Sequence, residues 1–118
     1  MTKPVHHAER TVKKFGGVVE DYLKIHDFFD ESKSCHPAME HRMVTHHAYG
    51  IFLAEKLFGN FIVNADGRRV SVRDVGEQHI IDDLGFIPTL SDWAKQLVHA
   101  EWMNGVRRLN KSNVTLVD

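Results

Sequence analysis

The chain has 118 residues, enough for one domain with a hydrophobic core that needs no stapling disulfide bonds. Its formal net charge is −1, so no global charge attracts it to nucleic acid or to an anionic membrane. The single cysteine, Cys35, excludes an intrachain disulfide and fits a reducing compartment. The first ten residues lack the apolar stretch of a signal peptide, and no segment approaches the ~20 apolar residues of a membrane span. We therefore expect a protein of the cytoplasm with no membrane partner.

Helix signals divide the first half of the chain into three predicted helices. The first spans 4–15 and is ended by Gly16 and Gly17. The second spans 19–31, where apolar residues recur at helical spacing. The third spans 37–58, opens with a proline and is followed by a glycine, which makes it the longest predicted element.

The pattern then changes to a predicted β-hairpin at about 61–72. Its two short runs are rich in β-branched residues and enclose Asp66 and Gly67, a strong turn signal. A fourth helix is expected at 75–84, capped by Asp74.

A fifth helix is expected at 90–103, capped by Thr89 or Ser91. Its predicted apolar face consists of Leu90, Trp93, Ala94, Leu97 and Val98. The sequence thus predicts a mainly α-helical single domain over residues 1–104, with about five helices and one hairpin. Residues 105–118 have no clear period and are expected to form a C-terminal tail, either flexible or adding a strand.

The nine histidines are the unusual feature of the composition, and three of them fall within residues 40–50. If residues 37–58 form one helix, His47 lies in the middle of its apolar face and is buried. His46 then lies about 100° to one side and His41 about 120° to the other. One helix therefore cannot direct all three imidazoles at one ion.

A metal site would have to be assembled between helices. Two histidine–carboxylate pairs have helical i, i+4 spacing: His26 with Asp30, and His79 with Asp83. The predicted ligands are His47, His79, His26 and Asp83, and Glu77 or Asp83 is the candidate carboxylate ligand or general base. Such a mixed nitrogen and oxygen set suits Zn²⁺, Mn²⁺, Fe²⁺ or Ni²⁺.

The leading hypothesis is a small metal-binding protein that acts as a metal-dependent hydrolase on a small phosphorylated or nucleotide substrate. The ion would lower the pKa of its bound water and supply the nucleophile. His46 or His41 would orient substrate or carry protons. In the competing hypothesis the protein is a non-enzymatic interaction module whose histidines form a buried polar network. The short basic pairs do not indicate nucleic-acid binding, while Trp102 suggests a homodimer contact.

Four runs of the chain together resemble a small family of uncharacterised bacterial and phage proteins. They are "IHDFFDESK", "EHRMVTHHAYGIFLAEKLFG", "NADGRRVSVRDVGEQHIIDDLGFIPTLSDW" and "EWM". The family's signature is histidine-arginine, three residues and a histidine pair, with "GEQH" further along. The resemblance covers roughly residues 5–103. It implies a single compact domain of bacterial or viral origin, and hence the cytoplasm of a bacterial cell or of a phage-infected host.

A second, partial resemblance concerns HD-type phosphohydrolases. "THHAYGIFLAEKLFG" is similar to their first metal-histidine helix, and "IIDDLGFIP" to their histidine-aspartate segment. The resemblance implies His47 as first ligand and Asp82-Asp83 as the doublet, with aspartate where the family has histidine. His79, one turn away, would replace that histidine, and Asp92 is the candidate for the family's final aspartate. The implied chemistry is nucleotide or phosphodiester hydrolysis.

Overall fold

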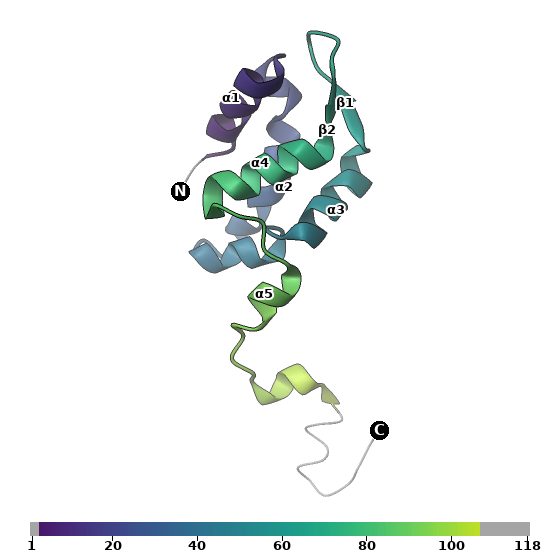
Figure 1. Cartoon of the computed structure of the whole chain (residues 1–118). Helices are drawn as coiled ribbons and strands as arrows, with labels where there is room; N and C mark the ends of the chain where they lie inside the picture. Colours follow the sequence, from purple (N-terminus) through teal and green to yellow (C-terminus); the bar gives the residue numbers. More distant parts are fainter. Residues whose placement is uncertain (1–2, 107–118) are drawn as a thin grey trace, which may run out of the picture.

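The structure is a computed structural model, and it describes residues 3–106 (Figure 1). Its α-helices are α1 (Pro4–Phe15), α2 (Leu23–Asp30), α3 (Ala48–Phe58), α4 (Val72–Leu84) and α5 (Leu90–Ala94). Short 3₁₀ helices are η1 (Val19–Asp21), η2 (Glu31–Ser34), η3 (Met39–Val44) and η4 (Glu101–Asn104). The strands β1 (Phe61–Val63) and β2 (Arg69–Ser71) form one antiparallel hairpin. The predicted fold class, mainly α with one hairpin, is confirmed.

Helix α1 has the predicted bounds, and the residues that end it also tie it to the hairpin. Gly16 and Gly17 adopt φ values of 82° and 77°, which side chains rarely tolerate. The amide of Gly17 donates to Asp66 Oδ2 at 2.9 Å, across to the hairpin turn. The turn residue Gly67 also has a positive φ, 80°, as the sequence predicts.

Helix α4 lies at the centre of the domain and contacts α1, α2, α3 and β2 (Figure 1). The core is formed by buried apolar side chains from α1, α2, α3, α4 and β2 and by Tyr22, which directly precedes α2. They are Ala8, Tyr22, Ile25, Phe29, Ile51, Ala54, Val70, Val72, Val75 and Ile80. Gly76 allows this packing, because a Cβ there would lie 3.0 Å from Phe29 Cζ. Helices α1, α2 and α4 therefore face one another closely, which brings their polar side chains together as well.

The prediction of a single helix over residues 37–58 is wrong. The segment forms η3 and α3, separated at Thr45–His47. The Thr45 hydroxyl donates to the Phe29 carbonyl at 3.0 Å, which anchors the break against α2. His47 then caps α3, with its Nδ1 accepting from the Gly50 amide at 3.0 Å. His47 is buried as predicted, but as a helix cap rather than in the middle of a helical face.

Two other predicted helices differ at their beginnings. The second is interrupted at Tyr22, whose hydroxyl donates to the Gly16 carbonyl at 2.7 Å, so that η1 precedes α2. The fourth begins at Val72 instead of residue 75, because Ser71 rather than Asp74 provides the cap. The Ser71 hydroxyl accepts from the Asp74 amide.

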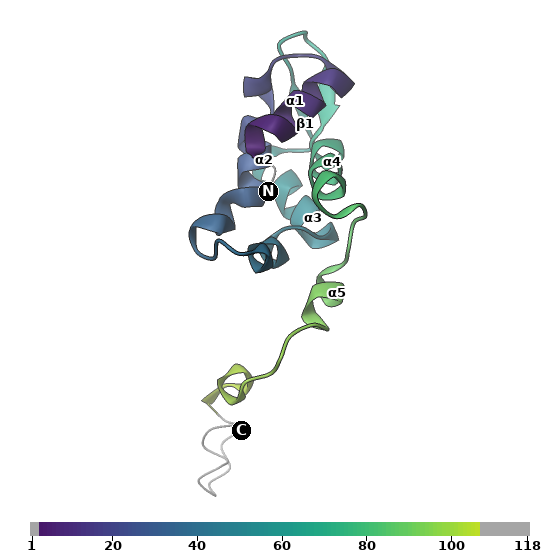
Figure 2. The ribbon, with the colours of Figure 1, turned by 90° about the vertical axis from the view of Figure 1, so that its left-hand side faces the viewer.

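The predicted fifth helix is much shorter than residues 90–103. Thr89 caps α5 as expected, but the helix ends at Ala94. Residues 95–106 project from the helical body, as both views of the ribbon show (Figures 1 and 2). Three residues of the predicted apolar face are exposed: Leu90 at 46%, Leu97 at 44% and Val98 at 86%. Most of the predicted tail, 105–118, lies outside the described residues.

Helix α5 is nevertheless attached to the body close to the histidines. The Ala48 amide donates to the Pro88 carbonyl at 2.9 Å, and Trp93 Nε1 donates to the His46 carbonyl at 2.8 Å. Among residues 3–106, no helix has the length and apolar character needed to cross a membrane.

Candidate metal centre

Six buried histidine and aspartate side chains gather where α1, α2, α4 and the start of α3 meet. They are His7 from α1, His26 and Asp30 from α2, His46 before α3, and His79 and Asp83 from α4. The four histidines are 0% exposed, and the Asp30 and Asp83 side chains are 6% and 2% exposed. We call this group the histidine–aspartate cluster.

One part of the cluster combines both carboxylates with two imidazoles. His46 Nε2 lies 2.8 Å from Asp83 Oδ2, and His79 Nε2 lies 3.4 Å from the same oxygen. Asp30 Oδ1 is 3.2 Å from His79 Nε2 and 4.0 Å from His46 Nε2. The donor atoms of these four residues all lie within 4.8 Å of one another. They therefore surround a small volume that suits one ion.

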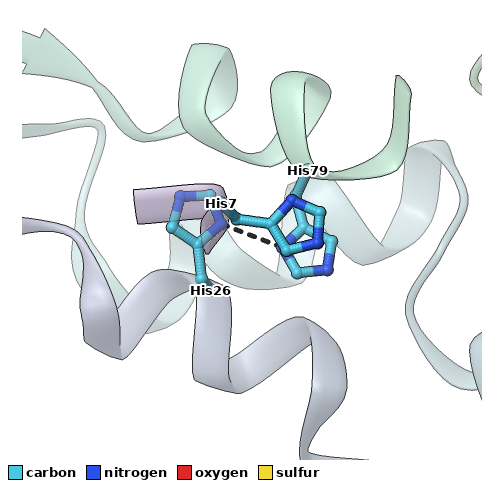
Figure 3. Close-up of side chains that lie close together, drawn as sticks. All are labelled: His7, His26 and His79. Atoms are coloured by element: carbon cyan, nitrogen blue, oxygen red, sulfur yellow. Dashed lines mark hydrogen bonds between the residues drawn. The ribbon is translucent and has the colours of Figure 1, made fainter. Parts of the chain in front are cut away.

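The other part of the cluster is a group of three stacked imidazoles, which includes His79. His7, His26 and His79 come from three different helices, and their rings stack at interplanar angles of 19–25° (Figure 3). His26 Nδ1 lies 2.9 Å from His79 Nδ1, the contact dashed in the figure. The ring of His79 thus joins both parts, with Nδ1 facing the histidines and Nε2 facing the carboxylates.

Burial and the carboxylates act against each other on the ionisation of the cluster. Burial disfavours the charged form of His79, but its hydrogen bonds with Asp30 and Asp83 outweigh burial and raise its pKa. Burial likewise opposes ionisation of both carboxyl groups. For Asp83, the imidazoles of His46, His7 and His79 beside it prevail over burial, and for Asp30 the hydrogen bond from His79 prevails. Both pKa values are therefore lowered. Both carboxylates stay ionised at neutral pH, which metal ligation requires.

His26 and His46 favour the neutral form. Burial, followed by the nearby charges of His79 and His7, lowers the pKa of His26 to about 2. Burial also lowers the pKa of His46, against the hydrogen bond to Asp83. Neutral imidazole is the form that binds a metal ion.

Four buried polar side-chain atoms in this region have no hydrogen-bond partner: His7 Nε2, Asp30 Oδ2, His41 Nε2 and Arg42 Nε. Two of them belong to the cluster. Native proteins pair buried polar atoms in the large majority of cases, so an unpaired group points to an ion, a water molecule or a functional role. Here the unpaired atoms are an imidazole nitrogen and a carboxylate oxygen, both of them atom types that bind metal ions.

The structure brings together three of the four ligands predicted from the sequence: His26, His79 and Asp83. His47 lies in neither group of candidate donors. Its Nδ1 caps α3 and its Nε2 lies 3.1 Å from the Val44 carbonyl oxygen, so both ring nitrogens are engaged. Glu77, the alternative carboxylate, also belongs to neither group.

The two residues predicted to orient substrate lie in different places. His46 contacts Asp83 directly and is a candidate ligand. His41 is buried beside it, with ring centroids 6.1 Å apart and edge-on, and its Nδ1 lies 2.9 Å from the Ala38 carbonyl. Of the predicted catalytic residues, Asp83 and His46 are thus inside the cluster, His41 is adjacent, and Glu77 is apart.

Sequence reasoning missed His7 as a donor and treated Asp30 only as the neighbour of His26. A signal for Asp30 was present, because histidine followed four residues later by aspartate occurs twice, in α2 and in α4. Such a pair puts both side chains on one helix face. No comparable signal marked His7. The sequence does not distinguish it from the adjacent His6, which is exposed.

The family model described as "Domain of unknown function (DUF6915)" matches residues 2–103 of this chain. Because this match spans most of the 118 residues, the chain belongs to that family. The expected membership of an uncharacterised domain family is thereby confirmed. No curated protein and no solved structure matches the chain.

Proposed function

We propose that this domain binds a divalent transition-metal ion through Asp30, His46, His79 and Asp83. The observation that supports this most strongly is a buried pair of carboxylates facing two imidazoles, with Asp30 Oδ2 left without a partner. Mixed nitrogen and oxygen donors match Zn²⁺, Mn²⁺, Fe²⁺ and Ni²⁺. A divalent ion would neutralise the two carboxylates, of which Asp83 also has Arg42 Nη2 at 3.8 Å.

The competing explanation is a structural network of buried histidines. Such a network stabilises a protein when every member is satisfied, and partial satisfaction is costly. In a network that serves stability alone, unpaired atoms such as His7 Nε2 and Asp30 Oδ2 are a cost without a return. The unpaired atoms therefore favour an ion over a purely structural role.

We further propose a hydrolase activity at this ion, acting on a small phosphorylated or nucleotide substrate. The residue that favours an anionic substrate is Arg42, whose Nη2 lies 3.8 Å from Asp83 Oδ1 and whose Nε has no partner. A planar guanidinium suits phosphoryl oxygens. Its side chain is 15% exposed, more than the ligands, so it lies between the cluster and the surface. An ion-activated water would be the nucleophile.

The likeness to HD-type phosphohydrolases remains part of this proposal. His79 and Asp83 leave α4 side by side, in keeping with a histidine one turn from the aspartate doublet. Asp92 accepts from the Thr89 amide as part of the α5 cap and is exposed, so we do not assign it to the ion. We also retain, as proposals, a bacterial or phage origin, a cytoplasmic location and a homodimer.

Thermal unfolding tests the metal proposal. Protein treated with a chelator should melt at lower temperature than untreated protein, and adding back Zn²⁺ or Mn²⁺ should restore the melting temperature. His46→Gln should lose this response. His36→Gln is the matched control, because His36 is exposed and its ring pairs with the exposed Glu40 at 3.6 Å, outside the cluster. A melting temperature that neither chelator nor metal changes would favour the non-enzymatic interaction module.

The hydrolase proposal has its own test. Metal-loaded protein is assayed on p-nitrophenyl phosphate and bis-p-nitrophenyl phosphate. Arg42→Gln should lower kcat/KM while metal content stays constant, because Arg42 contacts substrate rather than the ion in this proposal. Absence of turnover in metal-loaded protein would contradict the hydrolase and leave metal binding intact.

A further inference from the structure

His7 differs from the other histidines of the cluster in having one engaged nitrogen and one free nitrogen. Its Nδ1 lies 3.2 Å from Asp82 Oδ2, so Nδ1 carries the proton and donates to that carboxylate. Its Nε2 is buried, has no hydrogen-bond partner, and lies 3.3 Å from Asp83 Oδ1. In neutral His7 with its proton on Nδ1, the Nε2 lone pair faces this oxygen, and the two repel unless a proton or a metal ion lies between them.

His26 has the opposite arrangement, with both nitrogens engaged. Its Nε2 lies 2.8 Å from the Thr11 hydroxyl. That hydroxyl has one proton, which it donates to the His7 carbonyl or to Gln78 Oε1, so it accepts from His26 Nε2–H. Nδ1 of His26 is then an acceptor, and it faces the Nδ1–H of His79 at 2.9 Å. This bond leaves Nε2 of His79 as the nitrogen that faces the carboxylates.

One chain of hydrogen bonds joins His26 to His7. Gln78 accepts from Thr11 through Oε1 at 2.7 Å and donates through Nε2 to Asp82 Oδ2 at 3.1 Å. Asp82 in turn holds His7. The chain therefore runs from His79 through His26, Thr11, Gln78 and Asp82 to His7, and it fixes the ring orientation at both of its ends. Carboxylates and other acceptors bonded to the outer nitrogen of a ligand histidine act in this way at metal sites.

From this arrangement, and resting on the proposed metal function, we propose that His7 is a fifth ligand of the same ion and that His26 is a positioning residue. The ion then bonds to side chains from α1, α2 and α4 and from the segment before α3. Helix α1 contributes no carboxylate to the cluster, and His7 is its bond to the ion. Metal binding consequently fastens α1 to the rest of the domain.

Cobalt(II) titration of the chelator-treated full chain tests this assignment, with His7→Gln compared with His6→Gln. His6 is the neighbouring, exposed residue of the same helix, so the second variant controls for loss of a histidine from α1. The wild type and His6→Gln should bind one equivalent with the same affinity. His7→Gln should still bind one equivalent, more weakly by at least about 10-fold, because loss of an outer partner of a ligand alone typically costs about 10- to 100-fold. Its visible absorption should also change, because the coordination number of the cobalt falls.

Thr11 provides the test of the positioning chain. Thr11→Val should weaken cobalt binding, and Thr11→Ser, which keeps the hydroxyl, should restore it. A third measurement uses only wild-type protein, so that it does not depend on the folding of any variant. Amide hydrogen exchange in α1 should slow when metal is added, by more than exchange in the hairpin.

Three results would overturn the inference in distinguishable ways. Two equivalents of cobalt in the wild type, reduced to one in His7→Gln, would show a second ion among the three stacked imidazoles instead. Equal affinities and spectra for His7→Gln and His6→Gln would show that His7 is no ligand and pairs with Asp83 only electrostatically. No cobalt binding by the wild type would remove the proposed metal function itself.

Discussion

At the scale of single residues, some histidines of this domain form hydrogen bonds with the backbone and others face the carboxylates. His47 belongs to the first class. Its side chain takes the place of the serine or aspartate that usually caps a helix, and it is held by Val44 as well. His46, directly before it, belongs to the second class through its 2.8 Å contact with Asp83. Adjacent residues thus have unrelated roles.

This division gives a prediction for His47. His47→Ala should lower the free energy of unfolding by about 1–2 kcal/mol, because the α3 cap is lost. Its metal content should equal that of the wild type. His47→Asp, which restores a capping oxygen, should recover part of the loss. Urea denaturation and elemental analysis measure both quantities. Loss of the metal in His47→Ala would instead support the ligand role predicted from the sequence.

The raised pKa of His79 gives a prediction about protons. Burial opposes the charged form of His79, but Asp30 and Asp83 prevail and raise its pKa, whereas a bound ion needs the free Nε2 lone pair. Metal binding at pH 6.5 should therefore release protons from the charged fraction of His79. Calorimetric titration in buffers of different ionisation enthalpy measures this release. It should shrink as the pH rises above the pKa of His79, and a release that is absent at pH 6.5 would contradict the assignment.

At the scale of the elements, the junction between η3 and α3 positions His46. Gly50 is central to it, because a Cβ at this position would overlap the Thr45 carbonyl oxygen. Thr45 is in turn bonded to Phe29 on α2. The close approach of these two backbone segments directs His46 toward α4.

Gly50→Ala should therefore destabilise the protein by about 1–3 kcal/mol and weaken metal binding together. Tyr49→Ala, in the same turn but with a side chain 50% exposed, serves as control and should change neither quantity appreciably. Urea midpoints and cobalt affinity are the two measurements. If Gly50→Ala lost stability but kept full metal affinity, the junction would not be what positions His46.

The same junction shows where sequence reasoning reached its limit. Local signals were sufficient for α1 and for the hairpin, because prolines, glycines and turn residues specify those boundaries chemically. The apolar pattern of residues 37–58 fits one helix, and the break arises from packing of Thr45 against α2, which is tertiary. The candidate centre behaves likewise. The spacings of His26–Asp30 and His79–Asp83 could be read from the sequence, but the entry of His7 depends on how α1 packs.

At the scale of the whole molecule, the buried cluster links stability to pH. His26, His46 and His47 have lowered pKa values in the folded state, so they bind protons only after unfolding. Their contribution is fully present above the unfolded value of 6.5 and is lost as the pH falls below it. His79 acts in the opposite direction, since its raised pKa stabilises the fold below 6.5 and loses that effect at higher pH.

Three histidines lose their stabilising effect on acidification and only His79 gains one, so we expect metal-free protein to become less stable. Its urea midpoint should fall between pH 7 and pH 5, and it should fall further near pH 4, as Asp30 and Asp83 begin to lose the stabilisation that their lowered pKa values provide. A series of urea titrations across this range measures it. A midpoint that rises on acidification to pH 5 would mean that His79 dominates the balance.

The central claim, a metal ion held by the histidine–aspartate cluster, is tested most directly by elemental analysis of protein purified without a nickel column. We expect about one equivalent of a divalent transition metal per chain in the wild type and in His36→Gln, and almost none in His46→Gln or Asp83→Asn. Circular dichroism spectra of the variants show whether they remain folded. Wild-type protein free of metal, which also binds none when Zn²⁺, Mn²⁺, Fe²⁺ or Ni²⁺ is supplied, would contradict the account and make the cluster a structural network.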